Sequence, residues 1–588
     1  MAIGISDLSH TRRLFLLSLV SVGIIHLCYG LQRLTLGIDF TDEGAYLAWP
    51  LRMLFGEQPF AAELGTMLRP LSAYLSLVFK VHPAITLYEF RLIGWAIHLL
   101  SFCVLSTYLF RLTRAPLQSP LVASIPFFVC HIFGLASPSY NSISSDFLLL
   151  ALCFRGLASA HETRHPEALQ VGSGLALFVA TLAHMGLGLV AAAIVLYELF
   201  AGRLAQNILR RQLSPSNIGV LVFIGCWVAF VAYLQAIGAL AVWHHRLGLY
   251  QSVSVPSIRT NPLRFYTRLF SVPFVFSDFA LLVSWAAVAA AALMGLVSRS
   301  RPAATAALAL LLLFSFIYGF SYSPQNLLLT FAQAALILLA VHCLGFTTAL
   351  LPGDARVRFL LVMSGIAAVI YATVSYYFSP FRSWTSGILA LPFAFAVGLA
   401  LLLGAQPGRF TPLFRTLATA MLVLAVACVA RDHYRTIYRD APPAELHAEF
   451  RAPKFRHIHS TVERVQAIDA LYDYLHPRIQ RGEPLVVYDN CPMLYYLFDA
   501  KPAYGMAFAV RYTQSPAALE ELDREFRAKP LPRYAIRLIV NVSEPVWSTA
   551  VRFNYDNYPL NRTVMAGYEL DRTIFPFEVW RLKPAGRP

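Results

Sequence analysis

Long apolar runs with almost no charge recur along most of the chain, up to about residue 430. A helix rises about 1.5 Å per residue, so a run of about 17 to 25 apolar residues can cross the hydrocarbon core of a bilayer. Such runs predict membrane-spanning helices near residues 14–32, 92–110, 119–137, 143–160, 217–238, 279–297, 303–320, 326–346, 357–378, 384–404 and 412–430. The pattern therefore predicts a polytopic helical membrane protein, mostly α.

The apolar run 171–201 is ambiguous. As one helix it would be about 46 Å long, which is long for one crossing and short for two. The short loops that follow it carry arginines, and short cationic loops stay on the cytoplasmic side. A hairpin near His184 and Gly186 would put these loops on the same side as Arg12 and Arg13, whereas a single crossing would not. We therefore expect about 13 crossings, with the N-terminus inside, and the choice between one crossing and two at 171–201 stays open.

Beyond residue 430 the pattern changes to mixed charge with alternating apolar positions. Segments 485–488 and 535–540 have the pattern of strands, and a helix is expected from Pro492, with Asn490 nearby as its cap. The chain is thus predicted to divide into a transmembrane domain and an extracytoplasmic α/β domain. Their ranges are 1–430, with long outer loops at 33–91 and 239–278, and 431–588.

Composition agrees with a membrane location, since 57% of the residues are hydrophobic and 13% are charged. A net charge of +15 would suggest nucleic acid as a partner of a soluble protein. Here the cations lie between apolar runs, where they meet lipid head groups, so we expect membrane lipids and no nucleic acid as partners. Except for Cys491, the cysteines fall within apolar runs, and His244 and His245 lack a spaced carboxylate. We predict no metal site and no cofactor, and a divalent metal requirement stays open.

Three carboxylates follow the first apolar run closely, at Asp39, Asp42 and Glu43. Thr41 can cap a helix that begins at Asp42, and the first turn of a helix keeps carboxylates ionised. An ionised carboxylate at the outer membrane surface can accept a proton. The alternative is that Asp42 and Glu43 are ordinary residues of a helix start at a wet interface, and their spacing alone does not separate the two.

Arginines of the two long loops are candidates for holding an anion. Arg69 is followed by Pro70 at the start of an apolar run, Arg52 lies nearby, and Arg264 and Arg268 lie in the second loop. An arginine fixed at the membrane edge can hold a phosphate by paired hydrogen bonds. Taken singly, each of them can equally be an anchor of a helix end at the interface.

Together these features resemble the membrane glycosyltransferases of the C superfamily, GT-C, which includes aminoarabinose transferases and protein O-mannosyltransferases. The likeness rests on the Asp-Glu pair after the first helix, on Tyr46, on the step Arg69-Pro70-Leu71 and on the tail domain. Its motifs are confined to about the first 75 residues. The sequence departs from the family pattern at Ala45, where an arginine is commoner, and at Arg69-Pro70-Leu71, which stands where Lys-Pro-Pro is commoner.

The resemblance implies a sugar donor on a polyprenyl phosphate, an extracytoplasmic lipid, glycan or protein as acceptor, and a place in the inner membrane of a bacterium. Asp42 would be the general base of an inverting displacement, with Glu43 beside it as a second catalytic carboxylate. The substrate-binding residues would be Tyr46 and Asp39. The residues that hold the donor phosphate would be Arg69, Arg52, Arg264 and Arg268.

Two other functions stay open at this stage. A transporter or flippase of a lipid-linked or envelope substrate should carry charged or broken segments at the membrane midplane. A scaffold for envelope assembly would leave Asp42 and Glu43 dispensable. Two weaker candidate residues are Asp146, which can be a helix start, and His184, which can simply mark a turn.

Overall fold

The computed structural model describes residues 5–60, 70–129, 137–158, 164–200, 215–245, 396, 399–400, 411–435, 437–488, 490–507, 516–556 and 558–584. Several predictions fall outside these residues. They are the spans near 279–297, 303–320, 326–346 and 357–378, most of the span 384–404, and the residues Arg69, Arg264 and Arg268.

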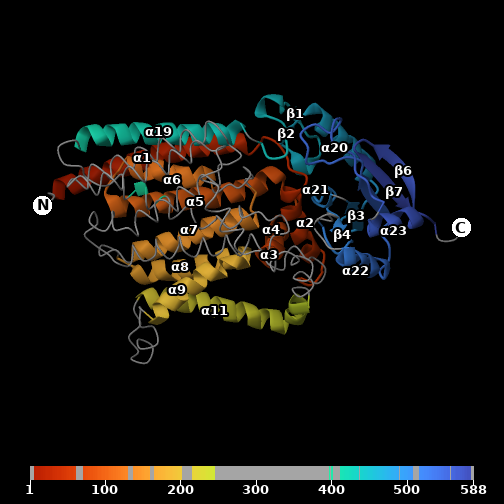
Figure 1. Cartoon of the computed structure of the whole chain (residues 1–588), viewed down its shortest axis with the longest axis horizontal. Helices are drawn as coiled ribbons and strands as arrows, with labels where there is room; N and C mark the ends of the chain where they lie inside the picture. The colour runs from red at the N-terminus through yellow and green to blue at the C-terminus, as the bar shows by residue number, and fades with distance from the viewer. Residues whose placement is uncertain are drawn as a thin grey trace, which may run out of the picture.

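Helices that lie side by side form the larger part of the molecule (Figure 1). They are α1 (Ile5–Arg33), α5 (Leu87–Thr113), α6 (Gln118–Val129), α7 (Tyr140–Ala158), α8 (Pro166–Ala183), α9 (Gly188–Phe200), α11 (Pro215–Ala236) and α19 (Thr411–Arg435). Within the described residues, five helical segments are long and apolar enough to cross a membrane: His10–Arg33, Leu87–Thr113, Pro166–Ala183, Asn217–Ala236 and Arg415–Arg435. The prediction of a mostly helical protein with several apolar spans is confirmed, and the count of about 13 crossings stays a prediction.

The apolar run 171–201 is divided into two helices. Helix α8 ends at Ala183, a 3-10 turn covers Met185–Leu187, and α9 begins at Gly188. The break therefore falls where a hairpin was expected. How many times this run crosses the membrane stays a prediction.

The described part of the first long loop contains three short helices, α2 (Asp42–Leu54), α3 (Pro70–Tyr74) and α4 (Ser76–Val81). Helix α2 begins at Asp42, as the sequence predicts. The loop ends at a capping box before α5, in which Thr86 accepts from the backbone N–H of Glu89 and Glu89 accepts from the backbone N–H of Thr86. The start of α5 is thereby fixed.

The part of the chain after α19, called the tail domain below, contains a mixed five-stranded sheet in the order β4-β3-β5-β7-β6. Strands β4, β3 and β5 are parallel, whereas β5, β7 and β6 are antiparallel. The strands are β3 (Pro484–Tyr488), β4 (Lys501–Pro502), β5 (Tyr534–Leu538), β6 (Tyr568–Ile574) and β7 (Phe577–Leu582), and a separate hairpin is formed by β1 (Ala448–Glu449) and β2 (His459–Ser460). Both predicted strands are present as β3 and β5, so the mixed α/β character of the tail is confirmed.

Four helices accompany this sheet: α20 (Val462–Leu475), α21 (Met493–Leu497), α22 (Pro516–Arg527) and α23 (Pro559–Gly567). Helix α21 begins one residue after Pro492, close to the predicted start. The prediction that Asn490 caps this helix is wrong, because the helix has no side-chain cap and the amide oxygen of Asn490 has no hydrogen-bond partner in the described part of the chain.

The tail domain packs directly on the first long loop and shares a hydrophobic core with it. Helices α2 and α21 touch at Gly44, where an added Cβ would lie 2.4 Å from the backbone nitrogen of Met493. Only glycine fits so close an approach. The backbone N–H of Met493 also donates to the carbonyl of Phe40 at 3.2 Å. The tail domain therefore fixes the helix that carries the acidic residues.

Candidate active site

Asp39 caps helix α2. Its carboxylate accepts from the backbone N–H groups of Thr41 and Glu43, each at 3.0 Å, and from the Thr41 hydroxyl at 2.6 Å. Thr41 itself makes no side-chain cap bond to the helix. The prediction that Thr41 caps α2 is wrong because the carboxylate two residues earlier already takes the free N–H of the first turn.

Glu43 is fully buried and forms a two-pronged ion pair with Arg91 of α5. The Arg91 Nε donates to Oε1 at 2.8 Å and its Nη2 donates to Oε2 at 2.7 Å, while the Ser137 hydroxyl donates to Oε1 at 2.5 Å. Arg91 also donates to the carbonyls of Leu34 and Gly37, at 2.8 and 2.9 Å. Both carboxylate oxygens of Glu43 are thus engaged in holding the loop, α5 and the end of α1 together.

Asp42 is the acidic residue of the three that reaches the surface. Its side chain is 26% exposed, whereas those of Asp39 and Glu43 are at 0%. The Tyr438 hydroxyl donates to Asp42 Oδ2 at 2.8 Å, and Nη1 of Arg439 lies 3.1 Å from the same oxygen. Both contacts are made by Oδ2 of a side chain that is partly exposed.

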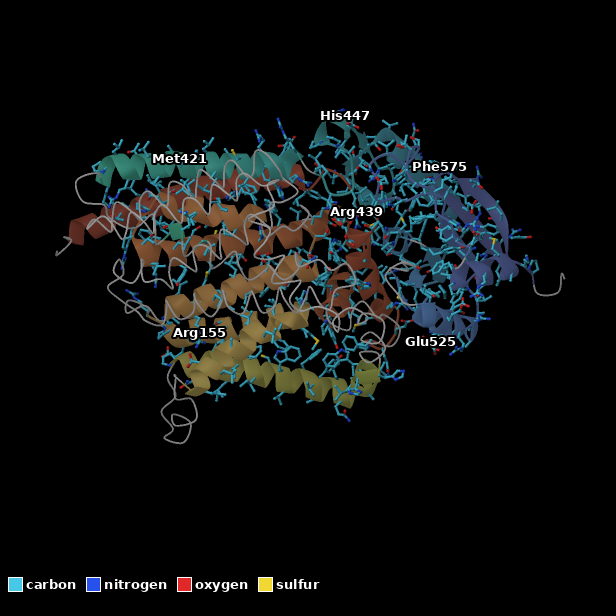
Figure 2. All side chains as sticks on the ribbon, viewed as in Figure 1. Arg155, Met421, Arg439, His447, Glu525 and Phe575 are labelled. Atoms are coloured by element: carbon cyan, nitrogen blue, oxygen red, sulfur yellow. The ribbon has the colours of Figure 1, made fainter. Side chains whose placement is uncertain are left out.

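Arg439 supplies the positive charge of the site. It follows α19 in a left-handed conformation, with φ of 55°, and its guanidinium lies 4.5 Å from the centre of the Tyr438 ring. Figure 2 shows Arg439 between the helical bundle and the tail domain. Burial opposes its charge, but the neighbouring carboxylates of Asp42 and Asp39 raise the pKa of Arg439 above its ordinary value. The group is therefore a permanent cation beside Asp42.

A second buried ion pair fixes Tyr438 and Arg439 in place. Asp440 accepts from the backbone N–H of Ile38 at 2.9 Å and from the Ser460 hydroxyl at 2.8 Å. Arg464 of α20 lies 3.3 Å from Asp440 and donates to the carbonyl of Ile38 at 3.2 Å. The segment after α19 is thus bonded to the segment before α2, which aligns the two side chains with Asp42.

The structure brings together four of the predicted site residues: Asp39, Asp42, Glu43 and Tyr46. Tyr46 lies one turn after Asp42 on α2. Arg52, by contrast, is buried against the tail domain, where it pairs with Glu57 at 3.0 Å and donates to the carbonyl of Tyr504. Its predicted role at the donor phosphate stays a prediction, as do those of Arg69, Arg264 and Arg268.

Sequence reasoning missed Tyr438, Arg439 and Arg91. Tyr438 and Arg439 lie almost 400 residues from Asp42 in the chain, so no local pattern connects them. The available signal was their place directly after the last apolar run, where a chain leaves the membrane. For Arg91, the signal was a charge at the start of an apolar run, which was treated as the end of a loop.

Comparisons with known proteins give no match among family models or curated proteins. Solved structures that are similar over nearly the whole chain include the following two. ArnT from Cupriavidus metallidurans, bound to undecaprenyl phosphate, has a TM-score of 0.41 and 13% identity, covering 96% of this chain and 98% of that chain. The oligosaccharyltransferase AglB from Archaeoglobus fulgidus, in complex with an inhibitory peptide and a dolichol-phosphate, has a TM-score of 0.44 and 12% identity, covering 97% and 75%.

The likeness to these structures is one of fold, at low sequence identity. TM-scores of this size assign no activity, substrate or site residue to the present chain. Those conclusions depend on the residues themselves.

In the described part of the chain, two pairs of ionisable side chains lie inside the helical bundle. Asp146 of α7 is buried and lies 2.8 Å from Nδ1 of His98 of α5, so it is more than the helix start that its sequence position suggested. Arg155 of α7 pairs with Glu198 of α9, which is also buried. Ionisable residues inside a membrane bundle are costly unless paired, and both pairs meet that requirement.

Among the described residues, no three His, Cys, Asp or Glu side chains gather as possible ligands. A divalent metal requirement stays open.

The buried carboxyl of Asp39 predicts a pH dependence of stability. Burial raises the pKa of Asp39 to about 6, although Arg439 opposes the shift. An unfolded Asp titrates near about 3.9, so between about pH 4 and 6 the folded state binds more protons and loses stability as the pH rises. We expect the thermal midpoint of the purified protein to fall, relative to that of Asp39→Asn, through this window. If the difference in thermal midpoint between the wild-type protein and Asp39→Asn were the same at every pH, this prediction would be contradicted. The control is Asp473→Asn, which changes an exposed carboxylate.

Proposed function

We propose that this chain is a membrane glycosyltransferase that transfers a sugar from a polyprenyl-phosphate donor to a hydroxyl group of an extracytoplasmic lipid, glycan or protein. The observation that carries the proposal is Asp42, a partly exposed carboxylate held by Tyr438 and Arg439 at the end of the helical bundle. The sequence resemblance at Asp42, Glu43 and Tyr46 supports it. The same resemblance and the arginine distribution support an inner membrane location in a bacterium, with the tail domain outside.

The proposed reaction is a single displacement. The oxygen of the acceptor hydroxyl bonds to the anomeric carbon, and the bond from that carbon to the phosphate oxygen breaks. The electron pair leaves with the polyprenyl phosphate, and the hydroxyl proton passes to Asp42. Attack on the side opposite the phosphate inverts the anomeric centre.

Positive charge is needed where the phosphate departs, because its negative charge grows as the bond breaks. Arg439 supplies such a charge 3.1 Å from Asp42. In the proposal it joins the arginines predicted from the sequence, which are Arg69, Arg52, Arg264 and Arg268. The donor reaches the site by diffusion within the membrane, so no nucleotide-binding fold is required.

The other two carboxylates enter the proposal as positioning residues. Glu43 has both oxygens bonded to Arg91 and Ser137, which leaves it no place for a substrate proton. Asp39 holds the first turn of α2 and so sets the direction in which Asp42 points. Their geometric role would explain why three acidic residues lie so close together.

A second candidate function is transport of a lipid-linked substrate. It is favoured by the His98–Asp146 and Arg155–Glu198 pairs, since paired ionisable residues inside a bundle are typical of transport pathways.

One experiment separates the two functions. The purified protein is placed in sealed proteoliposomes with labelled undecaprenyl-phosphate sugars and envelope acceptors, with protein-free liposomes as the control. We expect label on the acceptor and a matching amount of free undecaprenyl phosphate. Movement of intact donor across the bilayer, with no acceptor labelled, would replace the enzyme by a transporter.

A further inference from the structure

Aromatic side chains gather on the face of α2 that carries Asp42. Tyr46 and Trp49 follow Asp42 by four and seven residues, the spacing of one helix face. The ring centres of Tyr46 and Trp49 lie 5.8 Å apart, and the Tyr140 ring of α7 lies 5.6 Å from Tyr46 and 6.3 Å from Trp49. The ring of His184, at the break after α8, lies 5.8 Å from Tyr140. Three separate segments therefore meet beside Asp42.

A short serine-rich segment holds Tyr140 and Asn141 against α2. The Ser137 hydroxyl donates to Glu43 at 2.5 Å. The Ser139 hydroxyl accepts from the backbone N–H of Ser142 at 3.0 Å and so caps the start of α7. The segment is bonded to α2 at one end and begins α7 at the other, so the position of Tyr140 relative to Trp49 is fixed.

Two polar atoms are unpaired, one on Trp49 in this aromatic cluster and one on Asn141, the residue after Tyr140 on α7. The indole N–H of Trp49 and the amide oxygen of Asn141 are buried and have no hydrogen-bond partner in the described part of the chain. The residues are only 5% and 6% exposed. Buried groups of this kind are nearly always hydrogen-bonded, so an unpaired one calls for an explanation. Packing of a hydrophobic core explains the rings, but it leaves an unpaired donor and an unpaired acceptor unexplained.

We propose that Trp49, Tyr140 and Asn141, with Tyr46 and His184, form the subsite for the saccharide of the donor, and that this saccharide is a hydroxylated pyranose. The inference deepens the proposed function and rests on it. A pyranose has an apolar C–H face that packs on aromatic rings, and its hydroxyl groups both accept and donate. One hydroxyl oxygen would accept from the Trp49 indole, and another hydroxyl would donate to Asn141.

A purely apolar ligand fits this cluster less well, because it would leave both polar atoms unpaired. The position also suits a sugar, because Trp49 lies within two helical turns of Asp42, the proposed base.

The test compares two lipids that differ only in the saccharide. The purified full-length protein in nanodiscs is titrated with undecaprenyl phosphate and with undecaprenyl-phosphate glucose, mannose and galactose. We expect the wild-type protein to bind at least one sugar lipid more tightly than undecaprenyl phosphate. Trp49→Phe keeps an aromatic ring and loses the N–H, and Asn141→Leu loses the acceptor. Each should reduce this preference by about 2- to 12-fold, the usual range for one hydrogen bond, with the affinity for undecaprenyl phosphate unchanged.

The control is Trp580→Phe in β7 of the tail domain, where the indole N–H already donates to Glu578. It should leave the preference unchanged. A preference that survives in both Trp49→Phe and Asn141→Leu overturns the subsite, and so does a wild-type protein that does not distinguish the lipids. A different result would overturn the proposed function: the wild-type protein would transfer no sugar to any acceptor.

Discussion

Replacing Asp42 by asparagine is expected to lower the kcat of sugar transfer by about 10²- to 10⁴-fold, the usual contribution of a general base. Asparagine has nearly the same shape, and its amide oxygen can still accept from the Tyr438 hydroxyl, but it cannot take a proton from the acceptor. The thermal midpoint and the affinity for donor should therefore change little. The measurement is the transfer rate at saturating donor, with donor binding measured on the same preparation.

The matched control for Asp42→Asn is Glu445→Gln, at an exposed carboxylate in the tail domain. It should transfer at the wild-type rate. If Asp42→Asn transferred as fast as wild type, Asp42 would not be the base. If Glu43→Gln lost transfer while its thermal midpoint held, the roles given to the two neighbouring carboxylates would be reversed.

Arg91→Met is expected to destabilise the protein strongly, by about 3 to 5 kcal/mol, the usual cost of removing one partner of a buried ion pair. The change leaves the carboxylate of Glu43 buried with only Ser137 as a side-chain partner, and it frees the carbonyls of Leu34 and Gly37. The expected result is a large fall in the thermal midpoint of the purified protein in detergent.

A double variant separates the ion pair from simple loss of packing. The double variant Glu43→Gln/Arg91→Met leaves no buried charge without a partner. Its thermal midpoint should therefore lie well above that of Arg91→Met alone. Arg581→Met removes an exposed arginine that pairs with Glu569, and it should leave the midpoint almost unchanged. A double variant as unstable as Arg91→Met would show that packing, and not the charge of Glu43, sets the cost.

The parts of the fold that could be predicted are those with a local signal. Apolar runs of membrane length gave the bundle helices, and the charge-free break near His184 and Gly186 appears as the turn between α8 and α9. The alternation at 485–488 and 535–540 gave two neighbouring strands of the tail sheet. Each depends only on neighbours in the chain, as the physics of helix and strand formation requires.

The site could be predicted only in part, because half of it comes from the far end of the chain. The start of α2 at Asp42 was readable from Thr41, Asp42 and Glu43. The cap was assigned to Thr41, since the pattern does not tell which of two oxygen-bearing side chains takes the N–H groups, and in the fold Asp39 takes them. Arg439 meets Asp42 only because the tail domain folds back onto the first long loop.

The burial of the three carboxylates could not be predicted from the sequence either. Asp39, Asp42 and Glu43 look alike in the sequence, yet two of them are enclosed and one is partly exposed. The difference arises from Arg91, Ser137 and the tail domain, which cover one side of α2. A similar limit applies to Asp146, whose partner His98 lies on a different helix.

The anomeric configuration of the transferred sugar tests the central claim most directly, since a single displacement assisted by Asp42 allows one outcome. The product formed by the purified wild-type protein from an undecaprenyl-phosphate sugar of known configuration is examined by NMR of its anomeric proton. We predict a product of inverted configuration. A product of retained configuration would contradict the account, because it requires a covalent sugar intermediate and a nucleophile in place of a base.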